Sequence, residues 1–284
     1  MNIPASTFQM LQRHWLAEPS ALTQITMRAI HIAEHGLPAN TSAMDARPVQ
    51  TAWGNAVEFM DIRDDGVAVV PVHGPLGQKL TWFDKWAFEM TDYLDLRSDL
   101  EEAAAQGASL IVLDMNSPGG EVLGLHDFAK CVAEMNEIIP VVRFNGTLSA
   151  SAAEYLSAGA SLSLSAESAI NGSIGSIAQA MDYSGYLEKL GIKARTFTSG
   201  DLKGIGNPYN AMPEAHQKFL QDMVNDSGAA FRQWMRDNRG EQVPDDAMRG
   251  QILRTSQALE FGLIDGIAPT LEHAIAQARE TLGV

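Results

Sequence analysis

The sequence contains very little cysteine and few basic residues, and each shortage excludes a class of structure or partner. Cys131 is the single cysteine among 284 residues, so no disulfide can form within the chain. We therefore expect a buried thiol and a reducing compartment, the cytoplasm. Lys and Arg number 20 against 35 Asp and Glu, which gives a formal net charge of -15. So acidic a chain has no electrostatic basis for binding nucleic acid or an anionic membrane.

Two further patterns are missing from the chain. The N-terminus has no basic start followed by an apolar run, so it resembles neither a secretory signal nor a membrane anchor, and we expect a soluble protein. His, Cys and carboxylate residues are not grouped at the spacing typical of metal ligands, so the sequence predicts no metal site.

The first 64 residues differ in pattern from the rest. Apolar residues recur at helical spacing over Phe8–Trp15 and Leu22–Ala33, whereas residues 36–56 are rich in Pro, Gly, Ser and Asn with little periodicity. We therefore predict an N-terminal helical arm and linker over residues 1–64, followed by one domain over residues 65–284.

Within that domain, short apolar runs alternate with longer amphipathic stretches, which indicates an α/β fold of repeated β-α-β units. Strands are predicted at 66–74, 109–115 and 140–146, and helices at 90–107 and 121–138. Right-handed crossovers would make these strands parallel. Because sites in open parallel sheets lie at the carboxyl ends of strands, the segments after the second and third strands are the natural candidates.

Both of those segments have the composition of a catalytic site. Gly119 and Gly120, in the sequence SPGG, free the backbone to turn and to present bare N–H groups near a helix N-terminus, which is how an oxyanion hole is built. Ser151 lies in FNGTLSASAAEYLSAGA among very small residues, which suits a nucleophile that must leave room for a substrate backbone. The plainer interpretations are a strand-to-helix turn and a capping or packing serine.

A nucleophilic serine needs a general base, and the sequence offers two. A triad of Ser151, His126 and Asp114 can be written, but no spacing favours it. Lys203 follows a predicted strand over residues 192–200 and lies among glycines and a proline, in SGDLKGIGNPY. A lysine becomes a base once burial lowers its pKa from about 10.4 toward roughly 7 to 8, so Lys203 would need a desolvated pocket.

The ordered motifs NSPGG, SASAAEY, NGSIGS, SGDLKGIGNPY and TSQALEFGLIDGI resemble the signal-peptide-peptidase family of serine peptidases, over about residues 66–267. The chain is particularly similar to the soluble branch encoded by tailed phages and prophages, the prohead proteases of head maturation. The resemblance implies a core related to Clp protease and the crotonases, a Ser–Lys dyad, and no metal or organic cofactor.

Site residues follow from the resemblance one by one. Ser151 matches the nucleophile, Lys203 the general base, and Ser173 the hydroxyl that holds the lysine amine. The oxyanion hole would be formed by Gly119, Gly120 and Ala152. The implied reaction is acyl transfer, in which neutral Lys203 takes the proton of Ser151 and the alkoxide attacks a peptide carbonyl.

The expected function is a serine endopeptidase that processes phage capsid or scaffold proteins, and itself, in the host cytoplasm or inside the prohead. Three alternatives stay open: a bacterial cytoplasmic peptidase of the signal-peptide-peptidase type, a crotonase-like acyl-CoA enzyme, and a non-catalytic assembly protein. A homo-oligomer is expected because relatives enclose their sites in rings or bowls. Nucleic acid and membranes are not expected as partners.

Two local features of the sequence allow opposite interpretations. Glu154 follows Ser151 by about one helical turn, and it would raise the pKa of Lys203 if it lay beside the amine, or it points elsewhere. An aromatic cluster in LTWFDKWAFEM suits either a subunit interface or the protein's own core. Its members are Trp82, Phe83, Trp86 and Phe88.

Overall fold

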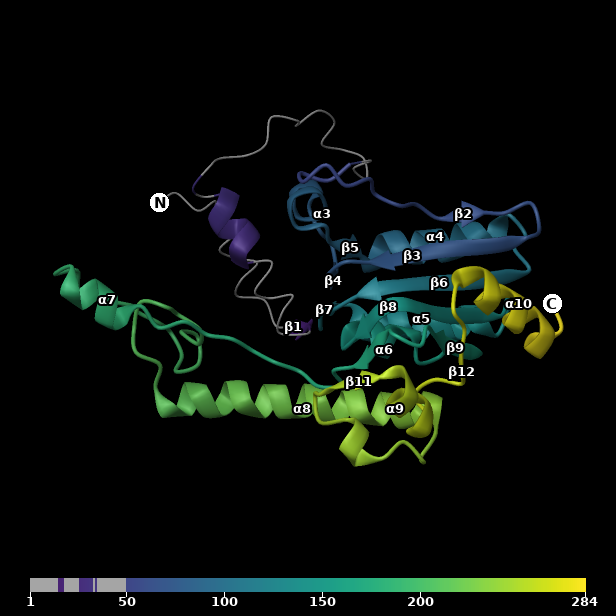
Figure 1. Cartoon of the computed structure of the whole chain (residues 1–284). Coiled ribbons are helices and arrows are strands. Elements are labelled where there is room, and N and C mark those ends of the chain that lie inside the picture. Colours follow the sequence, from purple (N-terminus) through teal and green to yellow (C-terminus); the bar gives the residue numbers. More distant parts are fainter. Residues whose placement is uncertain (1–14, 18–25, 33, 35–49) are drawn as a thin grey trace.

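The computed structural model describes residues 15–17, 26–32, 34 and 50–284. A central sheet of order β11-β10-β8-β6-β3-β2 organises the fold, with β9 paired to β8 and β12 to β9 (Figure 1). Its strands are β2 Asp61–Ile62, β3 Val67–His73, β6 Leu110–Ser117, β8 Val141–Ala150, β9 Leu162–Ser165, β10 Ile170–Gly172, β11 Ile252–Arg254 and β12 Gly266–Ile267. Strands β3, β6, β8 and β10 are parallel, whereas β2 and β11 run antiparallel to their neighbours.

A smaller sheet of order β1-β7-β4-β5 lies at the carboxyl ends of the parallel strands (Figure 1). Its strands are β1 Trp15–Ala17, β4 Leu76–Gly77, β5 Thr91–Asp92 and β7 Gly119–Glu121. The helices are α3 Trp82–Phe88, α4 Tyr93–Ala105, α5 Leu125–Asn136, α6 Ala152–Ser157, α7 Ser184–Lys189, α8 Glu214–Arg239, the 3-10 turn η1 Asp245–Ala247, α9 Thr255–Glu260 and α10 Leu271–Leu282.

Both faces of the central sheet are covered, which is why β3 and the first halves of β6 and β8 are mostly apolar. Successive residues of a strand point to opposite faces. In β3, Ala68 and Val70 pack in the cluster formed with α4, α5 and α6, whereas Val67 packs in the cluster formed with α10. The sheet is therefore packed between two apolar clusters, one on each face.

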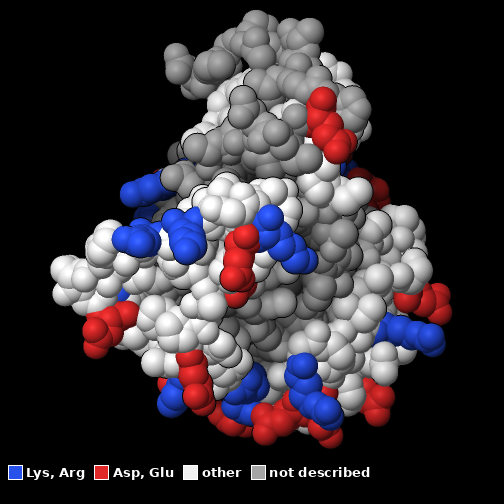
Figure 2. Space-filling view, turned by 90° about the vertical axis from the view of Figure 1, so that its left-hand side faces the viewer, with Lys and Arg blue, Asp and Glu red and all other residues white. Residues whose placement is uncertain are grey.

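One part of the chain leaves this body. Residues 177–223, which we call the projecting arm, include α7 and the N-terminal half of α8, and Figure 1 shows them extending away from the sheet. Pro208 is the one buried residue of this range. Seen from the side of the arm, charged side chains are scattered over a mostly uncharged surface (Figure 2).

Most of the predicted elements are confirmed. The three predicted strands correspond to the parallel strands β3, β6 and β8, and the two predicted helices to α4 and α5. Helix α4 begins with the Asp92 side chain accepting from Leu94 N–H and is followed by Gly107 at φ 79°, the left-handed conformation that glycine adopts without strain. Cys131 is buried on α5, as expected.

The prediction of a strand over residues 192–200 is wrong. These residues are irregular and almost all exposed, because no strand among the described residues pairs with this stretch.

The N-terminal predictions have mixed outcomes. Residues 26–32 are helical, whereas residues 8–14 lie outside the described residues and Trp15 begins a strand. The division at residue 64 stays a prediction.

The aromatic cluster belongs to the protein's own core, so its interpretation as an interface is wrong. Trp86 and Phe88 are 3% and 1% exposed, and Trp82 and Phe83 pack against the same cluster. Among the described helices, none combines the length and apolar content needed to cross a bilayer.

Candidate active site

Ser151 lies at the junction between β8 and α6, at the carboxyl edge of the parallel strands. Its backbone has φ 56° and ψ -117°, a region that non-glycine residues rarely occupy, and its side chain has no exposed surface. Its N–H donates to the Gly172 carbonyl at 2.8 Å, and its Oγ lies 3.4 Å from the Gly175 carbonyl oxygen. Strain of about 1–3 kcal/mol at such a residue marks a conformation that the surrounding packing enforces, and such residues cluster at functional sites.

Ser173 is brought beside Ser151 by strand pairing. Strand β10 runs parallel to β8 with Gly172 opposite Ala150, so each serine is the next residue after a paired position. Ser173 also has a positive φ of 53°, is 5% exposed, and donates its N–H to the Gln251 carbonyl at 2.7 Å. The structure thus brings together two of the three residues of the predicted Ser–Lys–Ser group.

The glycine pair lies on the other side of Ser151. Strand β6 pairs with β8 so that Ser117 is opposite Ser149, which places Gly119 and the start of α6 after adjacent strand ends. Gly119 has φ 98°, and a Cβ added at Gly120 would lie 2.1 Å from the Leu76 carbonyl oxygen, so only glycine fits both positions.

The N–H groups expected to form the oxyanion hole are held in a fixed segment. The Gly119 N–H donates to Ser117 Oγ at 3.2 Å, and Ser117 Oγ donates to the Gly74 carbonyl at 2.7 Å. Ala152, the other predicted donor, is the first residue of α6 and is fully buried. These contacts fix the local backbone, and the Gly119 N–H would exchange its bond to Ser117 Oγ for one to an oxyanion.

Lys203 is not brought to this group. It lies in a run of turns on the projecting arm, and its side chain is exposed. Within the described part of the chain, its ammonium has no hydrogen-bond or ion-pair partner. The desolvated pocket expected for a lysine base is absent around Lys203 in the described part of this single chain.

The alternative triad is not assembled. His126 Nδ1 lies 2.8 Å from the Tyr155 hydroxyl oxygen and its ring contacts Trp234. Burial raises the pKa of Tyr155 to about 12, so the phenol stays protonated. Asp114 Oδ2 lies 3.5 Å from His73 Nε2 instead. These contacts assign His126 to the packing of α5 against α6 and α8.

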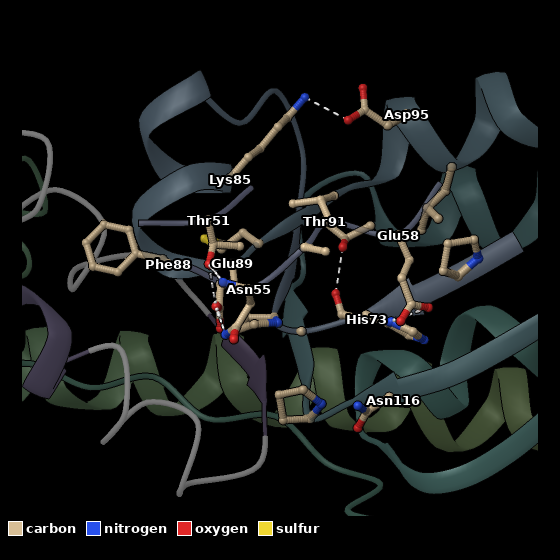
Figure 3. A pocket seen from close by; sticks show the side chains of 18 of the residues that line it. Thr51, Asn55, Glu58, His73, Lys85, Phe88, Glu89, Thr91, Asp95 and Asn116 are labelled. Carbon is tan, nitrogen blue, oxygen red and sulfur yellow. Dashed lines mark hydrogen bonds and ion pairs between the residues drawn. The ribbon is translucent and has the colours of Figure 1, made fainter. Parts of the chain in front are cut away.

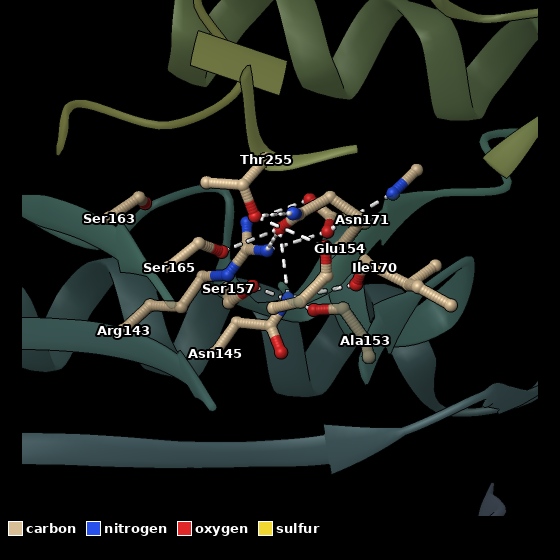
Figure 4. A network of polar contacts seen from close by, with 12 residues as sticks. Arg143, Asn145, Ala153, Glu154, Ser157, Ser163, Ser165, Ile170, Asn171 and Thr255 are labelled. Atoms are coloured by element: carbon tan, nitrogen blue, oxygen red, sulfur yellow. Dashed lines mark hydrogen bonds and ion pairs between the residues drawn. The ribbon is translucent and has the colours of Figure 1, made fainter. Parts of the chain in front are cut away.

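Glu154 forms a buried ion pair that the sequence did not reveal (Figure 4). The Arg143 guanidinium donates to both Glu154 carboxylate oxygens, at 2.7 and 2.6 Å, and the two side chains are 1% and 0% exposed. Arg143 also donates to Asn171 Oδ1 at 2.8 Å. The Glu154 carboxylate is therefore neutralised by Arg143, and it ties α6 to β8 and β10. The sequence feature that could have indicated this ion pair is the arginine that follows the apolar residues at the start of the predicted strand PVVRFNG.

A cavity of about 450 Å³ lies next to the glycine segment, since Pro118 and Leu148 belong to its wall. Figure 3 shows this cavity with His73 and Glu58 among its lining side chains. His73 lies in it between Glu58 and Asp114, at 3.6 and 3.5 Å. The ligand atoms of these three residues lie within 4.8 Å of one another, the spacing of a possible cation site among the described residues. Nothing beyond this spacing points to a metal, so we assign none.

Glu89 joins the N-terminal residues to another wall of this cavity. Its carboxylate accepts from Thr51 Oγ1 at 2.9 Å, from Asn55 Nδ2 at 2.6 Å and from Arg28. Burial alone would raise the pKa of Glu89, but the hydrogen bonds from Asn55, Arg28 and Thr51 outweigh it and hold the pKa below its ordinary value.

Comparison with known proteins identifies relatives over most of this region. The chain is 33% identical over 195 residues to a protease of Methanocaldococcus jannaschii, covering 68% of this chain and 61% of that protein. It is 31% identical over 221 residues to capsid assembly protease C of Escherichia phage lambda, covering 77% and 50%. It is 32% identical over 177 residues to a signal peptide peptidase SppA of Enterococcus faecium, covering 61% and 50%.

The chain thus spans about half to three fifths of the length of these curated relatives. The model of Peptidase family S49 matches residues 133–284, which include Ser151, Ser173 and Lys203. Because this match covers more than half of the chain, the chain belongs to peptidase family S49.

Proposed function

We propose that this chain is a serine endopeptidase whose nucleophile is Ser151 and whose general base is Lys203. The observation that carries the proposal is the strained, fully buried Ser151 at the carboxyl end of β8, with Ser173 and the glycine segment beside it. The chain that holds this group belongs to a peptidase family. Family membership also removes the support for an acyl-CoA enzyme.

The proposed reaction is acyl transfer with water as the final acceptor. Lys203 Nζ takes the proton of Ser151 Oγ, and the oxygen attacks the substrate carbonyl carbon. The N–H groups of Gly119, Gly120 and Ala152 donate to the resulting oxyanion. Lys203 then protonates the leaving amine, and a water molecule repeats the sequence to release the acyl group and regenerate Ser151.

The base must reach Ser151 from a second copy or by a large movement of the arm. We favour the second copy, because the arm exposes many large apolar side chains that an intersubunit contact would cover. Among them are Tyr186, Leu190, Ile192, Phe197, Leu202 and Tyr209. Phe197 is 90% exposed, and it lies six residues before Lys203. A neighbour that covers Phe197 would also desolvate the region of the lysine.

The proposed substrates are phage capsid or scaffold proteins. Support comes from the similarity to the capsid assembly protease of phage lambda, which extends over 77% of this chain. A peptidase of the bacterial signal-peptide-peptidase type is the second candidate, supported by the relative from Enterococcus faecium. The single buried Cys131 fits a reducing compartment, so we place the reaction in the cytoplasm.

The decisive test mixes two inactive variants. Ser151→Ala and Lys203→Ala are each expected to cleave no protein substrate, whereas Lys193→Ala, on the same arm, remains active as the control. If Lys203 acts on the Ser151 of another copy, mixed oligomers of the two inactive variants regain part of the activity, because some sites contain both residues. Full activity of Lys203→Ala would overturn the proposed base, and inactive mixtures would overturn its supply by a neighbour.

A further inference from the structure

A short strand from the N-terminal part of the chain lies on the glycine segment. Strand β1 runs antiparallel to β7, with Trp15 opposite Glu121, Leu16 opposite Gly120 and Ala17 opposite Gly119. The other edge of β7 is taken by β4, which pairs Leu76 with Gly120. Strand β1 therefore occupies the one edge of β7 that the body itself leaves open.

An open strand edge beside a peptidase nucleophile is a peptide-binding surface by its chemistry. Its main-chain N–H and C=O groups pair with any extended segment, so affinity comes from the backbone and selectivity from the side chains. β1 shows which arrangement the edge accepts, an antiparallel segment that runs from Glu121 toward Gly119. Because Gly119 follows the end of β6 and Ser151 follows the end of β8, this direction leads toward the nucleophile.

The proposed site residues have almost no exposed surface in the arrangement in which β1 is paired. Ser151, Gly119, Gly120, Ala152 and Ser173 are all buried in this arrangement. A substrate peptide that added to β7 would need the same main-chain partners that β1 already uses, so the two cannot be bound together. A pair of three-residue strands is weak by itself, which makes β1 a displaceable occupant.

We infer that residues Trp15–Ala17 are an internal competitor of the substrate, held on the peptide-docking edge of β7 until an incoming peptide replaces them. This inference rests on the proposed function for the meaning of the edge, but the contact itself requires no catalysis. A peptide can bind only to molecules in which the edge is free. The apparent affinity therefore equals the intrinsic affinity multiplied by the fraction of such molecules.

The test measures peptide binding in a chain that cannot cleave. All proteins carry Ser151→Ala, and the probe is a fluorescein-labelled RHWLAE peptide, the sequence of residues 13–18. In the full-length chain, the double variant Leu16→Pro with Ala17→Pro removes the backbone N–H groups of both residues. The N–H groups of successive residues point to opposite sides of a strand, so one of the two lost N–H groups is the one directed at β7. The matched control, Leu16→Ala with Ala17→Ser, keeps both N–H groups.

The proline variant is expected to bind the probe about threefold to thirtyfold more tightly than the control, by analogy with the release of a partly populated competitor. Hydrogen exchange at Gly119–Glu121 should also become faster in the proline variant. Exchange in β6 and β8 should stay unchanged, and this serves as the control that the body is still folded. Equal affinities of the two variants, or no binding of the probe to either, would overturn the inference. If cleavage is found but the affinities are equal, the proposed function stands and this inference falls.

Discussion

The body and the projecting arm carry the two halves of the proposed dyad, and they hold them in opposite ways. Ser151 lies in a fully buried junction, fixed by strand pairing on both sides and by the Arg143–Glu154 ion pair beneath α6. Lys203 lies among exposed turns, in a range where Pro208 is the one buried residue. The body fixes the proposed nucleophile by its own packing, whereas the proposed base would need another surface to bury it.

The largest expected effect concerns Ser151 itself. Ser151→Gly should reduce cleavage by about 10⁴-fold or more, because the attacking oxygen is lost. The same change should raise the free energy of unfolding by about 1 kcal/mol, since glycine adopts φ 56° without the strain that serine carries there. Mass spectrometry of the products and urea unfolding measure the two effects.

Ser151→Ala is the matched control for this pair of effects. It removes the hydroxyl but keeps the Cβ, so it should lose activity with no gain in stability. A Ser151→Gly variant that is less stable than Ser151→Ala would show that the junction is unstrained.

The second effect concerns the buried ion pair of the body. Arg143→Met leaves the Glu154 carboxylate uncompensated at 0% exposure, and we expect a loss of about 3–5 kcal/mol in the free energy of unfolding. Activity should fall with it, because Glu154 lies on the helix that follows Ser151. Urea denaturation of the unsubstituted chain and of Arg143→Met measures this loss in the free energy of unfolding.

The control is Arg97→Met, which breaks the exposed Arg97–Glu101 pair and should change stability little. Replacing both buried partners, with Arg143→Met and Glu154→Leu, should recover part of the lost stability because no charge is left unpaired. Similar losses for Arg143→Met and Arg97→Met would contradict the view that the body depends on this pair.

The third effect concerns the arm. If the arm associates as proposed, Phe197→Ser should weaken self-association by about tenfold or more and lower activity in proportion. The unfolding of the body should be unchanged, because Phe197 is 90% exposed in the single chain. Sedimentation velocity reports the association. Leu123→Ser, at a 72% exposed position on the body, is the control. If Phe197→Ser and Leu123→Ser self-associate equally strongly, the interface does not include Phe197.

The smallest effect is the pH dependence at Glu89. The folded-state pKa is lowered, so the unfolded chain takes up its proton first as pH falls. The stability that Glu89 contributes is full above its ordinary pKa of 4.5 and is lost as pH falls through the lower folded-state value. Glu89→Gln should therefore flatten the stability profile in that range, as thermal unfolding from pH 3 to 7 (a range chosen to include that pKa) will test. An unchanged slope would contradict this role.

The sequence predicted what depends on neighbours along the chain. The apolar runs of β3, β6 and β8 identify parallel strands because both faces are buried, and the strand ends then place Ser151 and the glycines at one edge. Gly107 identified the end of α4 because a left-handed residue favours glycine.

What the sequence could not predict depends on contacts between distant segments. The Arg143–Glu154 pair requires knowing that α6 packs over β8, and the β1–β7 pairing joins residues about a hundred positions apart. The false strand at 192–200 has the composition of a strand without a partner to pair with. The aromatic residues near Trp86 could not be assigned, because burial within a core and burial at an interface select the same side chains.

Helix α8 extends well beyond the body that anchors it. Its buried residues, Gly228, Phe231 and Met235, all lie in its C-terminal half. The Ser176 hydroxyl donates to the Val224 carbonyl at 2.7 Å, so residues 214–223 extend about 15 Å beyond this last contact with the body. A tilt of about 10° at the anchored end would move the free end by about 3 Å, roughly the length of a hydrogen bond. The packing of Phe231 and Met235 on the body therefore determines how accurately the arm is aimed.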